Sequence, residues 1–265
     1  MSKPTLTIGY STLASRLGNI QLPDLSSNLN WDALITVQSG DDHSPTVEQL
    51  LQSPIGERIT TKAYSGRGVT KLRNQVIKNA TGKYLVFADD DITFKEQGLS
   101  DALAYLEGNP EIALLLGQAV DETGKLRKNY PKAITKLTKL NSARAATYEM
   151  IIRLDAIKTA EIFFDENFGA GTENTYLGDE YIFIADLLSA NLRCEYAPIV
   201  LAVHPTRSSG SGWGTDQDRK ARALIFDRVF KGNRTLPYLA RIAFGMRKLG
   251  RELSPLQFVK FVFKR

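Results

Sequence analysis

Three consecutive carboxylates, Asp89, Asp90 and Asp91, are the residues whose type and spacing most directly indicate chemistry. They follow residues 83–88, an apolar run of the kind expected at the centre of a parallel sheet that is covered on both faces. Ligands of open α/β sheets bind beyond the carboxyl ends of such strands. Adjacent carboxylates repel one another, and a hard cation such as Mg²⁺ or Mn²⁺ relieves that repulsion. The triplet therefore favours a metal site over the alternative, a solvated turn whose last acid caps a helix.

A second group of polar residues lies just upstream, around a predicted helix at residues 69–79. Gly66, Arg67 and Gly68 precede this helix, and Lys71 stands where a dinucleotide fingerprint would need its third glycine. The remaining signal is a helix N-terminus with Lys71 and Arg73 one turn inside, which suits a diphosphate. A surface helix with solvated cations is an equally good interpretation.

Two further candidates lie in the second half of the chain. Asp179 and Glu180 occupy the first turn of a predicted helix at 178–190, where a carboxylate can act as a general base or simply cap the helix. His204 ends a predicted strand at 199–203, and a histidine at that position can ligate a metal. The Gly- and Ser-rich loop that follows, 206–214, has the composition of a lid that carries Trp213.

The elements that must position these residues alternate along the chain. Apolar runs predict strands at 6–10, 31–38, 58–64 and 83–88, with a short helix at 14–17 after the first strand and the helix at 69–79 between the last two. Strands separated by helices indicate a βαβ architecture. The less regular second half predicts further elements, namely helices at 99–106 and 178–190 and strands at 112–116, 147–154 and 199–203. The composition changes near Asp218, so we expect a catalytic body at 1–217 and a separate segment at 218–265.

Composition excludes several classes of protein. The chain has 265 residues, of which 43% are hydrophobic and 24% charged, so collagen-like and disordered chains are excluded. No run approaches the ~18 apolar residues of a membrane-spanning helix, and residues 1–7 lack the apolar core of a signal peptide. A single cysteine, Cys194, fits a reducing compartment. We therefore expect a cytoplasmic protein.

Charge is concentrated at the C-terminal end. Residues 219–265 hold 13 Lys and Arg against 2 Asp and Glu, a net +11, whereas the whole chain carries +5 and the remainder therefore −6. The basic balance belongs to this tail and not to the body, so we predict no nucleic-acid partner. Apolar residues of the tail share one helical face and its cations lie elsewhere: Leu239, Ile242, Ala243, Met246 and Leu249 against Arg241, Arg247, Lys248 and Arg251. This pattern favours peripheral contact with an anionic membrane through 219–265, with packing on the body or on another subunit as the alternative.

Taken together, the motifs resemble a family 2 glycosyltransferase with the GT-A fold. The resemblance covers roughly residues 5–215, and its motifs stand in the family's order: Arg73-Asn74, Asp89-Asp90-Asp91, Phe164-Asp165-Glu166-x-Phe168-Gly169, Gly178-Asp179-Glu180 and His204. It implies a mixed, mostly parallel sheet flanked by helices. It also implies an inverting, Mn²⁺- or Mg²⁺-dependent transfer from a nucleotide sugar, such as a UDP-sugar, to a hydroxyl of a glycan or a lipid-linked acceptor. Such an enzyme would serve bacterial surface polysaccharide synthesis at the inner face of the plasma membrane.

The same resemblance implies roles for individual residues. Asp91 would ligate the metal, Asp89 would contact the metal or the ribose, and His204 would be a further metal or diphosphate contact. Other residues would bind the nucleotide: Tyr10, Ser11, Gln38, Arg73 and Asp90. The family's base is the Asp of a Glu-Asp pair, whereas this chain has Asp179-Glu180. Glu180 is therefore our candidate base, and Asp179 is the alternative.

Two other functions remain open from the residues alone. The series Asp89-x-Asp91-x-Thr93 after an apolar strand also matches the nucleophile motif of haloacid-dehalogenase-type phosphatases, with Asp89 as nucleophile. The second acid that those enzymes place after a Gly-Asp pair is missing beyond Asp179. A non-catalytic, membrane-docked carbohydrate-binding module is the third hypothesis.

Overall fold

The apolar segments of the first ninety residues form four neighbouring parallel strands in the computed structural model, which describes residues 4–23, 29–38, 56–173, 175–205 and 215–263. Their order across the sheet is β3-β2-β1-β4. The strands are β1 (Leu6–Leu13), β2 (Trp31–Gln38), β3 (Ile59–Tyr64) and β4 (Tyr84–Ala88). The helix α2 (Val69–Asn79) connects β3 to β4, with the bounds that the sequence predicts. The expected βαβ architecture is therefore present.

The second half completes one mixed sheet, in the order β3-β2-β1-β4-β8-β6-β9-β5, with β7 paired to β9. The added strands are β5 (Thr93–Phe94), β6 (Ile112–Val120), β7 (Thr135–Lys136), β8 (Met150–Arg153) and β9 (Arg193–Val203). The short strands β5, β7 and β8 are antiparallel to their neighbours, and the longer strands all run in one direction. The expectation of a mixed, mostly parallel sheet is confirmed.

Two local expectations need correction. The predicted strand at 147–154 is a 3-10 turn, η3 (Thr147–Glu149), followed by the four-residue β8. The predicted helix near 14–17 is also a 3-10 segment, η1 (Ala14–Asn19), and another, η2 (Gly56–Arg58), precedes β3. In η3 the Glu149 carboxylate accepts a hydrogen bond from the backbone N–H of Ala146 at 3.0 Å, which closes the turn before the strand can begin.

Helices cover both faces of the sheet, because the strands are apolar on both sides. In β4 the side chains of Tyr84 and Val86 face α3 (Glu96–Gly108), whereas those of Leu85 and Phe87 face the opposite core. That second core is closed by α2, α4 (Leu154–Thr159) and α5 (Asp179–Ser189). The N-terminus of α5 therefore lies on the same side of the sheet as α2.

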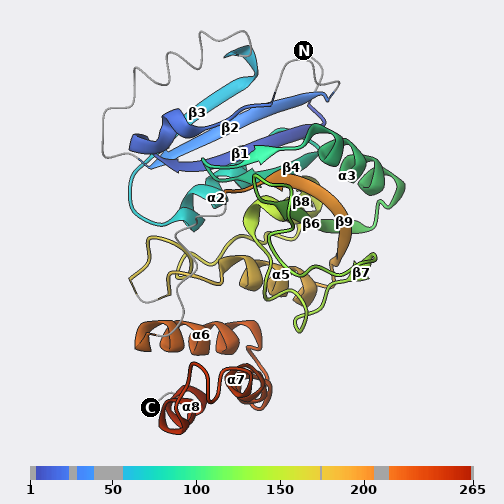
Figure 1. Ribbon diagram of the computed structural model, residues 1–265. Coiled ribbons are helices and arrows are strands. Elements are labelled where there is room, and N and C mark those ends of the chain that lie inside the picture. The colour runs from blue at the N-terminus through green and yellow to red at the C-terminus, as the bar shows by residue number, and fades with distance from the viewer. Residues whose placement is uncertain (1–3, 24–28, 39–55, 174, 206–214, 264–265) are drawn as a thin grey trace.

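The C-terminal segment forms a further layer of helices beneath α5: α6 (Asp216–Val229), α7 (Leu236–Met246) and α8 (Pro255–Phe263) (Figure 1). An apolar cluster joins α6 to α5 through Ile225 and Val229. Arg228 adds ion pairs at 2.7 Å to Asp165 and Asp186. The proposed division between 217 and 218 falls inside α6, so this helix belongs to both parts.

One residue of the tail differs from its predicted environment. Arg241 is buried, ion-paired with Asp227 of α6, and donates a hydrogen bond to the backbone carbonyl of Val262 at 2.8 Å. It lies away from the apolar stripe as expected, but α6 and α8 cover that side of α7. No helix in the described ranges has the length and apolar character needed to cross a bilayer.

Candidate active site

A cleft of about 890 Å³ opens where β1, β2 and β4 end and α5 begins. This is the edge at which open α/β sheets bind ligands. Its walls combine two kinds of charge, with Asp89, Asp90, Asp91, Asp179 and Glu180 opposed by Arg16, Arg67, Arg73, Lys128 and Arg144. The acidic residues singled out in the sequence lie in this one cleft, although 88 positions separate Asp91 from Asp179.

The Asp triplet does not act as one cluster, because each carboxylate has a different environment. Asp90 is buried, accepts a hydrogen bond from Thr12 Oγ1 at 2.6 Å, and pairs with Arg16 at 2.5 Å. Burial raises the pKa of Asp90, and Thr12 and Arg16 partly oppose that rise. Asp90 lines the cleft as predicted, yet its two oxygens are bound by Thr12 at the end of β1 and by Arg16 in η1.

Asp89 and Asp179 share a buried cation. Arg73 Nη2 lies 3.1 Å from Asp89 Oδ1, while Nη1 contacts Asp179 Oδ2 and lies 3.9 Å from Glu180 Oε1. Burial lowers the pKa of Arg73, but the three carboxylates outweigh it and hold that pKa above its usual value. Arg73 lines the cleft and is held there by protein carboxylates, and its contact with a diphosphate stays a prediction.

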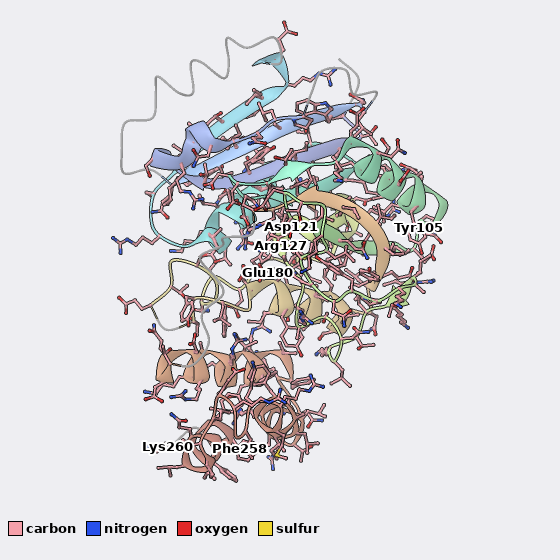
Figure 2. The ribbon with its side chains drawn as sticks, in the orientation of Figure 1. Tyr105, Asp121, Arg127, Glu180, Phe258 and Lys260 are labelled. Carbon is pink, nitrogen blue, oxygen red and sulfur yellow. The ribbon has the colours of Figure 1, made fainter. Side chains whose placement is uncertain are left out.

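Two adjacent carboxylates at the start of α5 differ in access to the cleft. Asp179 is 4% exposed, and burial, together with the charge of Glu180, raises its pKa while Arg73 lowers it. The Glu180 side chain is 22% exposed and accepts a hydrogen bond from Thr147 Oγ1 at 2.8 Å. Figure 2 shows Glu180 at α5, between the sheet and α6. Of these two adjacent carboxylates, Glu180 is therefore the one more open to the cleft.

Asp91 and His204 face each other across the cleft, with Asp91 Oδ1 4.0 Å from His204 Nε2. His204 Nδ1 lies 2.7 Å from the carbonyl of Pro205, which can only accept, so in the neutral ring Nδ1 carries the proton and Nε2 presents a lone pair. An imidazole held this way is oriented as a metal ligand. The Tyr148 ring packs against the imidazole, with the two ring centroids 4.9 Å apart.

The predicted three-residue metal set is only partly assembled. Among the described residues, no three His, Cys, Asp or Glu side chains are grouped as metal ligands. Asp89 is the member that does not join, because its carboxylate is paired with Arg73. Asp91 and His204 remain as two facing ligand atoms, whose chemistry fits a divalent cation that takes its other ligands from a substrate.

The predicted base pocket also needs one correction. Ser11 and Gln38 line the cleft, but Tyr10 is fully buried and its hydroxyl donates to the carbonyl of Gln21 at 2.8 Å. Because β1 is buried on both faces, its sequence does not reveal which side chains point toward the cleft. The proposed lid at 206–214, including Trp213, lies outside the described residues.

Several residues of the cleft wall are not apparent from the sequence. Thr12 and Arg16 fix Asp90, and Thr147 fixes Glu180. Nothing in the sequence indicates these contacts, because the paired residues lie 78, 74 and 33 positions apart in the chain. Arg144 could have been suspected, because it lies in a segment rich in Lys and Arg.

Comparison with known proteins decides the family. The family model for glycosyl transferase family 2 matches residues 27–165, more than half of the chain. The chain belongs to glycosyl transferase family 2. This membership confirms the resemblance drawn from the motifs at Arg73, at the Asp triplet and at Asp165, and it favours the transferase interpretation over the phosphatase.

A curated relative is the poly(ribitol-phosphate) beta-N-acetylglucosaminyltransferase TarS of Staphylococcus aureus, known from two strains. It is 20% identical over 155 residues, which are 57% of this chain and 27% of TarS, so the match spans about a quarter of that protein. Solved structures extend the likeness to nearly the whole chain. S. aureus TarS 1–349 in complex with UDP-GlcNAc matches with a TM-score of 0.61 and 15% identity, over 97% of this chain and 81% of that one.

A second solved structure comes from a different organism. The mannosyltransferase PcManGT of Pyrobaculum calidifontis, in complex with GDP-Man and Mn²⁺, matches with a TM-score of 0.55 and 12% identity. The match covers 99% of this chain and 69% of PcManGT. At such low identity these structures establish the fold alone, which is the predicted GT-A fold.

Proposed function

We propose that the chain is an inverting glycosyltransferase that moves a sugar from a UDP-sugar to a hydroxyl of a glycan or a lipid-linked acceptor. Family membership supports sugar transfer, and the TarS complexes with UDP-GlcNAc and with UDP support a uridine nucleotide. The polymer named for TarS supports a place in bacterial surface polysaccharide synthesis. The reaction would take place in the cytoplasm, at the inner face of the plasma membrane where the acceptor is lipid-linked.

This proposal rests on one observation, the different environments of Asp179 and Glu180. Arg73 holds Asp179 in a buried ion pair, which leaves Glu180 as the accessible carboxylate beside the Asp triplet. As the acceptor oxygen bonds to the anomeric carbon, Glu180 takes its proton. The bond from that carbon to the phosphate oxygen breaks, and its electron pair leaves with the nucleoside diphosphate. Attack opposite the leaving group inverts the configuration, and no covalent nucleophile is needed.

The leaving diphosphate needs positive charge. Asp91 and His204 would hold Mn²⁺ or Mg²⁺, which when bound would neutralise that diphosphate. Arg16, whose side chain is 48% exposed and lies 4.0 Å from Asp91, adds a cation of the chain itself at the same place. The structural neighbour with GDP-Man and Mn²⁺ supports this use of a metal within the fold.

The acceptor side of the cleft favours a phosphate-bearing acceptor. Residues 123–148 contain seven Lys and Arg and no Asp or Glu. Lys128 and Arg144 of this segment line the cleft near Thr147, which contacts the candidate base; Lys128 is paired with Glu149 at 2.8 Å, so Arg144 is the cation that would meet a phosphate. Lys and Arg near a reactive hydroxyl attract a phosphate group of the same acceptor molecule. Both a polyol-phosphate polymer and a lipid-linked saccharide carry such phosphates.

The decisive experiment compares donor binding with transfer. Glu180→Gln removes the proton acceptor but keeps the shape of the side chain, so kcat should fall about 10²- to 10⁴-fold while the Kd for the UDP-sugar stays within about twofold. Glu107→Gln, at a half-exposed surface pair with Lys83, is the matched control and should behave as the parent does. Asp91→Asn should raise the Mn²⁺ concentration needed for half-maximal binding of the donor.

Other outcomes separate the rival functions. A Glu180→Gln variant with unchanged kcat would assign the base elsewhere. Trapping of a fluoroberyllate on Asp89 would establish the phosphatase instead. Sugar binding that is indifferent to Mn²⁺ and to Glu180→Gln, with no transfer by the parent chain, would indicate a carbohydrate-binding module.

A further inference from the structure

Exposed apolar side chains gather on the last two helices. In α7, Leu239, Ile242 and Met246 are 56%, 39% and 57% exposed, at the spacing of one helical face. In α8, the same spacing recurs at Leu256, Val259 and Phe263, which are 65%, 45% and 58% exposed. We call these two rows the outer face of the tail. Figure 2 shows α8, with Phe258 and Lys260 labelled, at the end of the molecule away from the sheet.

The two rows adjoin each other. The rings of Tyr238 on α7 and Phe263 on α8 lie 6.4 Å apart, and both are about half exposed. The opposite sides of the same helices are already packed, since Phe244 of α7 contacts both Phe226 of α6 and Phe261 of α8 at 5.9 Å. The helices of the tail therefore pack against one another without using the outer face. Apolar patches of this kind mark an interaction surface.

The charge around this surface indicates what it meets. Residues 219–265 carry a net charge of +11. Exposed cations stand next to the apolar rows, with Arg247 and Arg251 in the turn between the helices, Arg234 before α7 and Lys260 within α8. Two copies meeting through their outer faces would bring these exposed cations close to the same cations of the other copy, which disfavours a symmetric dimer. An anionic lipid surface satisfies both the apolar rows and the cations.

We infer that the outer face of the tail docks on an anionic phospholipid bilayer, with its apolar side chains in the headgroup region and its cations on lipid phosphates. The docked helices are fixed to the catalytic body through α6, where Arg228 pairs with Asp165 and Asp186. Docking would then hold the cleft at a set position relative to the bilayer. Only the use of that position, delivery of a lipid-linked acceptor, rests on the proposed function.

Vesicle flotation with the full chain tests this inference. The probes are unilamellar vesicles of pure phosphatidylcholine and of phosphatidylcholine with about 30 mol% phosphatidylglycerol, in low salt. The parent should float with the anionic vesicles and far less with the neutral ones, and high salt should weaken its binding. The combined variant Leu239→Gln, Met246→Gln and Leu256→Gln should bind at least about a hundredfold more weakly, at roughly a factor of five or more for each buried side chain. Arg247→Gln with Arg251→Gln should weaken binding about fivefold for each cation.

A matched control replaces exposed leucines of the body, Leu126→Gln with Leu140→Gln, and should float as the parent does. Circular dichroism and UDP-sugar binding show that each variant is folded with its cleft intact. Absence of the parent from anionic vesicles would overturn the inference, as would equal loss of binding in the control. A dimer in sedimentation that the three tail substitutions dissociate, without vesicle binding, would assign the outer face to a second copy. Vesicle binding without any sugar transfer would leave this inference standing and refute the proposed function.

Discussion

Gly178, the residue just before the two adjacent carboxylates, gives the sharpest test of how the tail supports the site. Its φ is +90°, a left-handed conformation that costs a residue with a Cβ about 1–2 kcal/mol. A Cβ added here would also lie 2.4 Å from Cδ1 and 2.7 Å from Cγ1 of Ile225 in α6. Relief of that overlap by moving α6 or α5 costs about 1–3 kcal/mol more. Gly178→Ala should therefore lower the free energy of unfolding by about 2–5 kcal/mol.

Two matched variants separate the causes. Gly232 has nearly the same φ, +89°, but a Cβ there meets no atom within 4 Å, so Gly232→Ala should show the backbone cost alone, about 1–2 kcal/mol. Ile225→Ala removes the atoms that would overlap and costs about 2–5 kcal/mol by itself, because Ile225 is buried. The double variant with Gly178→Ala should be more stable than the sum of the single effects by about 1–3 kcal/mol.

Urea unfolding at equilibrium provides all four free energies of this cycle. A Gly178→Ala variant that costs no more than Gly232→Ala would refute the reasoning, as would single effects that add within about 0.5 kcal/mol. Transfer by Gly178→Ala at a temperature where it is folded supplies a second measurement. Because Glu180 lies two residues further on, kcat should fall although no catalytic group has been removed.

Two further predictions concern pH. Burial raises the pKa of Asp179 in the fold, so its ionisation destabilises the fold as pH rises, and Arg73 is the cation that limits this loss. Arg73→Gln should thus cost about 3–5 kcal/mol at pH 8 and clearly less at pH 5, and an equal cost in urea unfolding at both pH values would contradict this. Asp165 shows the opposite sign: burial alone would raise its pKa, but hydrogen bonds from Arg228 and Asn167 hold it below the usual value. The pair with Arg228 therefore stabilises the fold above the ordinary carboxyl pKa and is lost as pH falls through the lowered value, so Arg228→Gln should speed hydrogen exchange in α6 at pH 7 and change it little near pH 3.

Local sequence patterns predict those helices, strands and site residues that depend only on residues close by in the chain. The helix at 69–79 and the carboxylates after β4 follow from hydrophobic periodicity and from a single apolar run. Side-chain partners are a different matter, since the triplet is divided among Arg16, Arg73 and His204, residues from three separate elements. Tertiary packing determines which side chain pairs with which carboxylate. The spacing of residues in the sequence does not predict these pairs.

The side-chain environments that the sequence does not predict have the same origin. Tyr10 is assigned to the base pocket by its place after a strand, but a strand buried on both faces gives no alternation to show where each side chain points. Arg241 is predicted correctly as lying off the apolar stripe of α7, and its burial follows only from the packing of α6 and α8 around that side. A helical wheel describes one helix, whereas the environment of Arg241 is set by three.

The order Asp179-Glu180, which departs from the Glu-Asp order of the family, is explained by one buried cation. Both carboxylates line the cleft, but neighbouring residues of a helix point about 100° apart, so Asp179 is buried against Arg73 while Glu180 is more exposed. Arg73 is buried under the sheet and needs a charged partner there, and Asp179 supplies it. The residue that follows must then project into the cleft, and a glutamate is long enough to reach the hydroxyl of Thr147 on the opposite wall. If Glu180 is the base, as proposed, its role depends on a side chain 106 positions from Asp179, and the exchange Asp179→Glu with Glu180→Asp should lose activity, because the shorter carboxylate at 180 would fall short of Thr147.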